Sequence, residues 1–293
     1  MQTADLLSRV RRLEIRSRHL VQDLFAGQSE SIFKGRGVEF EEVRPYVPGD
    51  EVRDIDWNVT ARLGEPYVKR FVEERELTVM LAVDVSRSMR FGTAGAEKRE
   101  LAAELCAVLG FAAVRNNDRV GLVLAGERVE HFVPPARGRT HLLRLLRDVL
   151  GAEPASGTRL GEGTRFLLRT LRRRSLVFWL SDFDDTIDVH DWRVLARRHD
   201  VVAMALRDPR DETLPAVGWV ELEDLERGRR VLVNTGSRGL RERYAREALQ
   251  RRKALEDSLR QAHCPLLELR TDQPYMPVLI RHFSRVRRGR GAA

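Results

Sequence analysis

Cysteine and long apolar runs are scarce in this sequence. Two of the 293 residues are cysteines, Cys106 and Cys264, and both lie in apolar surroundings, so we expect reduced core residues and no disulfide framework. No stretch approaches the ~20 consecutive apolar residues that a membrane-spanning helix needs. Charges occur throughout residues 1–24, which therefore lack the apolar core of a signal peptide. We expect a cytoplasmic protein without a transmembrane segment.

The chain also lacks the motifs of several function classes. It has no Gly-x-x-x-x-Gly-Lys phosphate loop, so we do not expect it to be an ATPase. It has neither zinc-finger spacing nor a basic patch interleaved with aromatic residues. The formal net charge is +8, but acidic residues are interleaved with the basic ones along most of the chain. We therefore expect no nucleic-acid partner.

What the sequence does contain is the pattern of an α/β protein. From residue 77 to residue 208, apolar runs of strand length alternate with helix-like stretches, and residues 119–133 predict a hairpin with one antiparallel edge strand. Residues 3–25 show the apolar stripe of an amphipathic helix that packs on the protein body. Residues 219–234 predict a second hairpin around Arg227-Gly228-Arg229. The expected parts are 1–76 (N-terminal helix and a loop-and-strand segment), 77–208 (α/β core), 209–262 (accessory hairpin and long helix) and 263–293 (last core strand, helix and basic tail).

One stretch, Leu77 to Met89, combines a buried strand with a polar strand end. Its first half is a short apolar run rich in β-branched residues, as in a parallel strand that is covered on both faces. Its second half places Asp84, Ser86 and Ser88 at alternate positions where the strand should end. Ligands of open α/β sheets bind at the carboxyl ends of the strands, and three hard oxygen groups there suit a small hard cation. The same side chains could also shape a turn and cap a helix.

Two further stretches are expected to bring oxygen side chains to the same edge. Residues 175–180 are an apolar run that is followed by Asp182, and Thr158 lies in a loop before a helix-like stretch. If the strands that end at Val83 and Leu180 are neighbours, two carboxylates and three hydroxyls converge. Such a set suits Mg²⁺ or Mn²⁺, with one coordination position open to an outside carboxylate. The lack of a thiolate or imidazole cluster argues against zinc.

The sequence resembles two known patterns. Asp84-x-Ser86-x-Ser88, Thr158 and Asp182 resemble the metal-ion-dependent adhesion site of von Willebrand factor A domains. Residues 37–62 resemble the segment that precedes such a domain in the bacterial family catalogued as domain of unknown function 58. The matching residues of that segment are Glu39-Phe40, Arg44-Pro45-Tyr46, Pro48-Gly49-Asp50, Arg53, Ile55-Asp56-Trp57 and Ala61-Arg62. From its residues alone, we expect the segment to be a folded, salt-bridged layer anchored by Tyr46 and Trp57.

The resemblance implies a fold, a site and a partner. The fold would be α/β, von Willebrand A-like and Rossmann-like: a mostly parallel sheet with helices on both faces and one antiparallel edge strand, plus a small β-containing accessory layer. Ser86, Ser88 and Thr158 would contact the metal directly, and Asp84 and Asp182 directly or through water. Family members are thought to act as adaptors with MoxR-type AAA+ ATPases, so the partner would be such an ATPase or its client. Mg²⁺ or Mn²⁺ would bind weakly until the partner supplies a carboxylate.

Two alternatives to a non-enzymatic, metal-dependent interaction module remain. Asp84 could be the nucleophile of a Mg²⁺-dependent phosphohydrolase, although haloacid-dehalogenase-type phosphatases usually carry a second acid two residues later, where this chain has Ser86. The site could also be degenerate and only structural. The interaction module is our hypothesis because oxygen side chains from three loops are expected at one edge.

Overall fold

The computed structural model describes residues 3–25, 39–47, 50–51, 55–72, 77–155, 157–224 and 229–290. The chain forms two compact units: a smaller one, Phe33–Leu77, and a larger one, Met1–Ile32 with Thr78–Ala293. The expected first part, residues 1–76, is therefore divided, because its N-terminal helix packs on helices of the larger unit. The accessory hairpin, the long helix and the last strand also belong to the larger unit.

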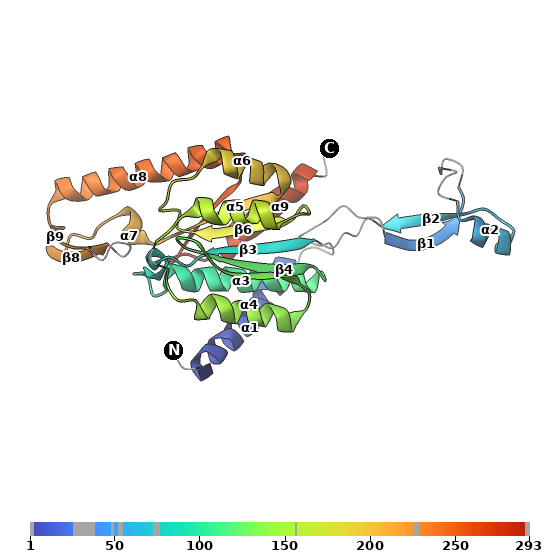
Figure 1. The fold of residues 1–293 in the computed structure, drawn as a ribbon, viewed down its shortest axis with the longest axis horizontal. Coiled ribbons are helices and arrows are strands. Elements are labelled where there is room, and N and C mark those ends of the chain that lie inside the picture. The colour runs from blue at the N-terminus through green and yellow to red at the C-terminus, as the bar shows by residue number, and fades with distance from the viewer. Residues whose placement is uncertain are drawn as a thin grey trace. The chain divides into compact units, whose positions relative to one another are not determined.

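A six-stranded sheet forms the centre of the larger unit, in the order β10-β7-β6-β3-β4-β5 (Figure 1). Neighbouring strands are parallel, except that β5 pairs antiparallel with β4 at one edge. The predicted mostly parallel sheet with one antiparallel edge strand is thereby confirmed. The strands are β3 (Thr78–Asp84), β4 (Arg119–Ala125), β5 (Val129–Ala136), β6 (Leu176–Ser181), β7 (Asp200–Arg207) and β10 (Leu266–Arg270).

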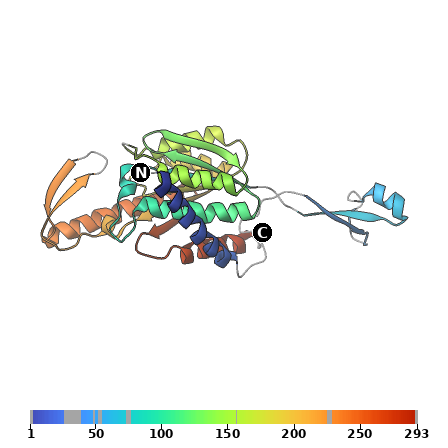
Figure 2. The same ribbon diagram turned by 90° about the horizontal axis from the view of Figure 1, so that it is seen from below.

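Helices cover both faces of this sheet (Figures 1 and 2). On one face α5 packs on α6 and α6 on α8, and on the other α3, α4 and α1 pack on one another. Burial on both sides explains why the central strands β3 and β6 are continuous apolar runs rather than alternating ones. The helices are α1 (Thr3–Phe25), α3 (Lys98–Arg115), α4 (Arg139–Gly151), α5 (Leu160–Thr170), α6 (Val189–Arg198), α8 (Arg238–Gln261) and α9 (Met276–Arg290).

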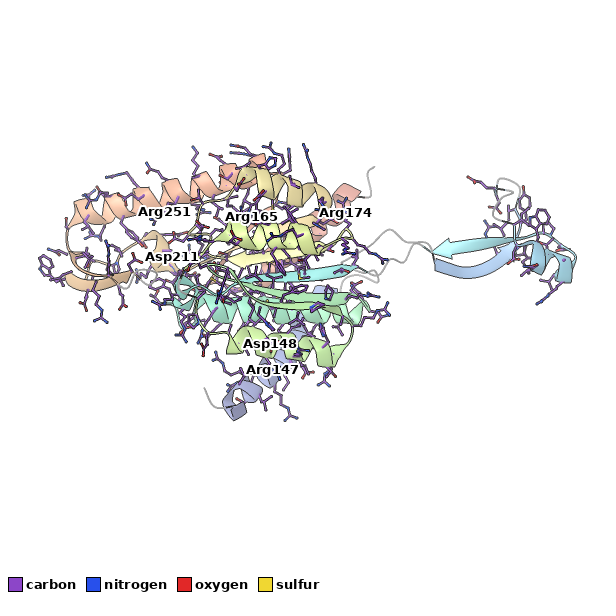
Figure 3. All side chains as sticks on the ribbon, in the orientation of Figure 1. Arg147, Asp148, Arg165, Arg174, Asp211 and Arg251 are labelled. Atoms are coloured by element: carbon purple, nitrogen blue, oxygen red, sulfur yellow. The ribbon has the colours of Figure 1, made fainter. Side chains whose placement is uncertain are left out.

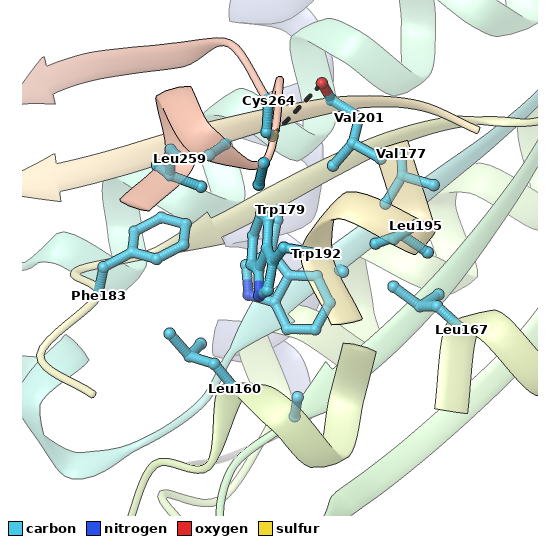
Figure 4. Close-up of a cluster of buried hydrophobic side chains, with 14 of the residues drawn as sticks. Leu160, Leu167, Val177, Trp179, Phe183, Trp192, Leu195, Val201, Leu259 and Cys264 are labelled. Atoms are coloured by element: carbon cyan, nitrogen blue, oxygen red, sulfur yellow. Dashed lines mark hydrogen bonds between the residues drawn. The ribbon is translucent and has the colours of Figure 1, made fainter. Parts of the chain in front are cut away.

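A buried aromatic cluster fixes the chain just beyond β6 (Figure 4). Trp179 of β6 and Trp192 of α6 are fully buried, with ring centroids 5.4 Å apart, and the ring of Phe183 lies 5.8 Å from Trp192. Gly163 allows α5 to approach this cluster, because a Cβ at that position would lie 2.6 Å from the Trp179 ring. Large buried rings contribute strongly to core stability. They therefore hold the backbone on both sides of Asp182 in place.

The N-terminal helix α1 packs on the larger unit through one face, as predicted. Arg139 Nε donates to Glu14 at 2.6 Å, and Arg9 donates to Glu100 at the same distance. These ion pairs join α1 to α4 and α3, which explains why the helix belongs to the larger unit. The buried residues of α1 follow the helical spacing of three and four; they are Val10, Glu14, Ser17 and Val21.

The smaller unit is a two-stranded antiparallel sheet of β1 (Glu39–Pro45) and β2 (Tyr67–Val72) with the short helix α2 (Trp57–Leu63). Arg44 donates two hydrogen bonds to the Asp50 carboxylate, at 2.6 and 2.8 Å. Asp56 caps α2 by accepting from the Asn58 backbone N–H. The expectation that Trp57 anchors this layer is wrong, because α2 has no buried residue and Trp57 is 65% exposed. Residues 37–38, 48–49 and 52–54 of the family-matching segment lie outside the described residues.

An accessory region lies between β7 and β10 in the chain. The short helix α7 (Pro209–Glu212) follows β7, and β8 (Trp219–Asp224) pairs antiparallel with β9 (Arg229–Asn234) ahead of α8. Of the predicted turn Arg227-Gly228-Arg229, the first two residues lie outside the described residues. Within the ranges that the structure describes, no helix combines the length and apolar character needed to cross a membrane.

Candidate functional site

Four of the five predicted site residues meet at the carboxyl ends of two neighbouring strands. β3 and β6 are paired in parallel, with Val83 opposite Leu180, so the residues that follow them emerge at the same edge. Asp84, Ser86 and Ser88 are linked by hydrogen bonds, and Ser88 lines the same cavity as Asp182. The fold therefore produces the predicted convergence of carboxylates and hydroxyls.

Asp84 is buried at the base of this cluster. Its Oδ1 accepts from the Ser86 backbone N–H at 2.8 Å, and its Oδ2 accepts from the Ser181 hydroxyl at 2.6 Å. Burial, and next the charge of Asp182, raise the pKa of Asp84 to about 7. Ser181 was missed by the sequence analysis; a polar residue at the end of an otherwise apolar strand was the available signal. Burial and the neighbouring charge of Asp182 thus disfavour the ionised form of Asp84 when no cation is near.

The two serines present their hydroxyls side by side. The Oγ atoms of Ser86 and Ser88 lie 2.9 Å apart. Ser86 is buried, and its backbone forms an isolated parallel β-bridge with that of Ala155. Ser88 lies in the single 3-10 turn that follows, Arg87–Arg90. The Met89 N–H donates to the Ser86 carbonyl and closes this turn. The tight turn is what directs two hydroxyls, two residues apart in sequence, toward the same point.

Asp182 forms a buried ion pair with a lysine that the sequence analysis did not assign to the site. Lys98 Nζ lies 2.8 Å from Asp182 Oδ2 and 3.2 Å from Asp211 Oδ2, and Lys98 is 3% exposed. Burial alone would raise the pKa of Asp182, but the charge of Lys98 and its hydrogen bond, together with the Ser88 hydroxyl and the charge of Arg207, hold that pKa below its ordinary value. Oδ1 of Asp182 is buried and, among the described residues, accepts no hydrogen bond. The available signal was a lysine opening the apolar helix α3.

Thr158, the fifth predicted residue, lies on a loop at the same edge. The Ala155 N–H donates to the Val85 carbonyl, and the Arg159 N–H donates to the Gly126 carbonyl, so the loop runs beside the ends of β3 and β4. Ser156 of the predicted Ser-Gly-Thr motif lies outside the described residues. In the part of the chain that the structure describes, the Thr158 side chain forms no hydrogen bond with the other four site residues.

The two acids that follow Asp182 have different surroundings. Asp185 accepts from the Leu160 backbone N–H at 2.9 Å, so it joins the loop after β6 to the start of α5. Asp184 lines the cavity, where burial and then the charge of Asp182 raise its pKa. Between them and Asp182, Phe183 has a φ of +53°, a left-handed conformation that a bulky residue seldom adopts. Its backbone N–H donates to the Ser181 hydroxyl, which holds this sharp turn.

The donor set is compatible with a small hard cation. Two adjacent hydroxyls and the unsatisfied Oδ1 of Asp182 are oxygen ligands of the kind that Mg²⁺ prefers, and a nearby cation would favour the ionised form of Asp84. No group of three or more His, Cys, Asp or Glu side chains among the described residues is arranged to hold a metal. A cation here would therefore depend on hydroxyls, water and an outside ligand, and it would share Asp182 with Lys98.

Comparison with known proteins identifies relatives along most of the chain. The family model described as "Protein of unknown function DUF58" matches residues 42–254. The chain is 36% identical over 290 residues to the uncharacterized protein Rv1480 of Mycobacterium tuberculosis, and equally to the uncharacterized protein Mb1516 of Mycobacterium bovis. Each alignment covers 97% of this chain and 90% of the relative.

Solved structures give weaker similarities. An aerotolerance-related membrane protein from Bacteroides fragilis is 14% identical with a TM-score of 0.48, and the match covers 71% of this chain and 99% of that one. The SpRpn10 VWA domain is 12% identical with a TM-score of 0.39, over 70% of this chain and 94% of that one. The roles that these names describe are properties of those two proteins and are not transferred to this chain.

Proposed function

The chain belongs to the DUF58 family, and we propose that it is a non-enzymatic, cytoplasmic interaction protein. A divalent cation, Mg²⁺ or Mn²⁺, at the ends of β3 and β6 would bind a carboxylate of a partner protein. One observation carries the proposal: Oδ1 of Asp182 is buried without a hydrogen-bond donor among the described residues. The serine hydroxyls, whose oxygens lie 2.9 Å apart, offer further oxygen ligands at the same edge. Buried polar atoms normally have a partner, and a bound cation would be one.

The chain's own residues would divide the work at this site. Ser86, Ser88 and Asp182 would hold the cation, with Thr158 contributing from its loop as the family resemblance implies. Asp84 would orient Ser86 through the hydrogen bond from the Ser86 N–H. The cation would supply a positive charge that attracts an outside carboxylate into the open coordination position. Metal binding would therefore be weak in the isolated protein and tighter once a partner is present.

Family membership supports a MoxR-type AAA+ ATPase, or the client of such an ATPase, as the partner. The resemblance to the family's segment at residues 37–62 and the match over residues 42–254 both point to the same group of proteins. The chain itself has no phosphate loop, so nucleotide hydrolysis would come from the partner. In this proposal the partner would hydrolyse the nucleotide, and this chain would act as an adaptor.

The geometry disfavours the two alternatives. Asp84 is 1% exposed and both of its oxygens accept hydrogen bonds from protein groups, so it is poorly placed to attack a phosphate as a phosphohydrolase nucleophile. A purely structural role accounts for Asp84 and Ser181 but gives no reason for a buried, unsatisfied oxygen on Asp182.

Co-precipitation with a purified partner tests the proposal. A purified MoxR-type AAA+ ATPase should be retained by the wild-type chain in Mg²⁺ and lost in EDTA. The double variant S86A/S88A should fail to retain it in Mg²⁺, while circular dichroism shows that the variant is folded. Equal retention by both proteins with and without metal would contradict cation-mediated binding.

A further inference from the structure

A cavity of about 780 Å³ adjoins the candidate metal site. Ser88, Asp182 and Asp184 line it at the edge of the sheet, and its other walls come from α7, the β8–β9 hairpin and α8. Figure 1 shows these three elements at one end of the larger unit. The cavity thus connects the carboxyl ends of β3 and β6 with the accessory region.

The β8–β9 hairpin contributes an apolar wall to this cavity. Val220 pairs with Val233 and Leu222 with Val231, and all four residues line the cavity. Val231 is nevertheless 58% exposed and Leu222 37% exposed. A two-stranded hairpin is marginally stable on its own, and contiguous exposed apolar side chains mark interaction sites. This face of the hairpin is therefore suited to being covered by another polypeptide.

The acidic side chains of the cavity are mostly paired within the chain. Asp184 is an exception: it lines the cavity but forms no ion pair with a residue that the structure describes. The pairs are Asp182 and Asp211 with Lys98, Glu212 with Arg252 and Arg270, and Glu223 with Arg230. The cavity therefore presents little unpaired negative charge.

Three arginines of the cavity are incompletely used. Arg210 and Arg251 line the cavity and form no ion pair within 4.0 Å with a residue that the structure describes, although the charge of Arg251 acts on Asp184 and partly offsets the rise in its pKa. Figure 3 shows Arg251 on α8, at the same end of the larger unit as Asp211. Arg207 donates from Nη1 to the Asp182 carbonyl at 2.7 Å, but its buried Nε has no hydrogen-bond acceptor among the described residues. Unpaired positive charge therefore exceeds unpaired negative charge beside the apolar wall.

We propose that this cavity binds a short segment of a partner protein in which carboxylates lie beside apolar side chains. The apolar side chains would cover the wall made by β8 and β9, and the carboxylates would pair with Arg210 and Arg251. The inference rests on the proposed function and deepens it, because one carboxylate of the same segment would reach the cation at Asp182. A second copy of this chain fits less well, since its own unpaired arginines would repel those of the first.

Selection from a random-peptide library displayed on phage tests this inference with the full chain as bait. The enriched peptides should combine Asp or Glu with Leu, Ile, Val or Phe. A synthetic peptide of the enriched sequence should bind wild type about tenfold more tightly than R210Q/R251Q, and L222Q/V231Q should weaken binding as well. The matched control R147Q/R174Q loses the same charge from arginines that pair with Asp148 and Asp200 elsewhere, and it should bind like wild type.

Several results would overturn the inference. These are a failure to enrich any peptide, enriched peptides without acidic residues, or equal affinity for wild type and R210Q/R251Q. Dimerisation of the wild type in analytical ultracentrifugation, abolished in L222Q/V231Q, would assign the hairpin face to a second copy instead. Repeating the binding in EDTA separates the two proposals. Binding that is weakened by R210Q/R251Q but persists in EDTA supports the cavity proposal and contradicts the cation. Binding that requires Mg²⁺ but is unchanged in R210Q/R251Q supports the cation and contradicts the cavity proposal.

Discussion

Lys98 Nζ lies 2.8 Å from Asp182 Oδ2, and both side chains are buried at the candidate metal site. The ammonium therefore occupies one side of a carboxylate whose other oxygen, Oδ1, is free of hydrogen bonds from the described residues. A lysine in this position has two effects that can be measured separately. It stabilises Asp182 when no metal is bound, and it reduces the charge available to attract a metal.

Replacing this lysine with methionine, K98M, should change stability and metal affinity in opposite directions. Loss of the buried counter-ion should lower the free energy of unfolding in EDTA by about 3–5 kcal/mol. Mn²⁺ should bind about tenfold more tightly, which corresponds to ~1.4 kcal/mol. Urea denaturation and titration of free Mn²⁺ by electron paramagnetic resonance measure the two effects. K253M, which alters an exposed lysine of α8, is the control, and weaker Mn²⁺ binding by K98M would contradict the prediction.

Removing both serine hydroxyls, S86A/S88A, should lower Mn²⁺ affinity at least about tenfold, because two of the proposed ligand oxygens are lost. The cost to folding should be modest, about 1 kcal/mol for each hydroxyl. S237A is a matched control: it removes the α8 cap at a similar cost of ~1 kcal/mol, far from the site in the chain. If S237A weakens Mn²⁺ binding as much as the double variant does, the effect reflects stability and not ligation.

The variant T158A tests whether the loop residue is a ligand. Its side chain forms no hydrogen bond with the other site residues in the described structure, so its loss should leave the unfolding midpoint unchanged. If Thr158 contacts the metal as the resemblance implies, Mn²⁺ affinity should still fall. T158S keeps the hydroxyl and should restore wild-type affinity. Unchanged affinity in T158A would remove Thr158 from the site.

His199 should make the protein sensitive to acid. Burial, and next the charge of Arg198, lower the pKa of His199 to about 4, and neither ring nitrogen has a hydrogen-bond partner among the described residues. Histidine in the unfolded chain has a pKa of about 6.5, so between pH 6.5 and 4 the unfolded state binds a proton that the folded state does not. The free energy of unfolding should therefore fall as the pH falls through this window. Urea denaturation at pH 7 and pH 5 should show a smaller drop in the free energy of unfolding for H199L than for wild type. An equal drop in the two proteins would contradict the prediction.

The sheet and the position of the site were predictable because both depend on short-range patterns. Continuous apolar runs marked β3 and β6, and neighbouring parallel strands necessarily place Asp84 and Asp182 at one edge. Alternate spacing marked Ser86 and Ser88 as a pair. These features can be predicted from the two-residue period of a strand and from the parallel direction of neighbouring strands.

The role of Lys98 was not predictable in the same way. Lys98 lies 84 residues from Asp182 in sequence, and its role depends on how α3 is set against the sheet, which periodicity does not specify. The exposure of Trp57 shows a similar limit, since an aromatic residue in a turn-rich segment indicates a core only when another element covers it. The environments of these residues depend on packing between elements that are distant in the chain.

The packing of α1 on α3 and α4 also has a consequence for how the chain can be rebuilt. Because α1 and β3 belong to one unit, the chain leaves that unit after α1 and returns to it at β3, and the smaller unit is an insertion within a single fold. The entropy cost of closing such an excursion depends only weakly on its length. The smaller unit is thus an internal insertion, so removing it would require a linker between the end of α1 and the start of β3 rather than truncation at either terminus.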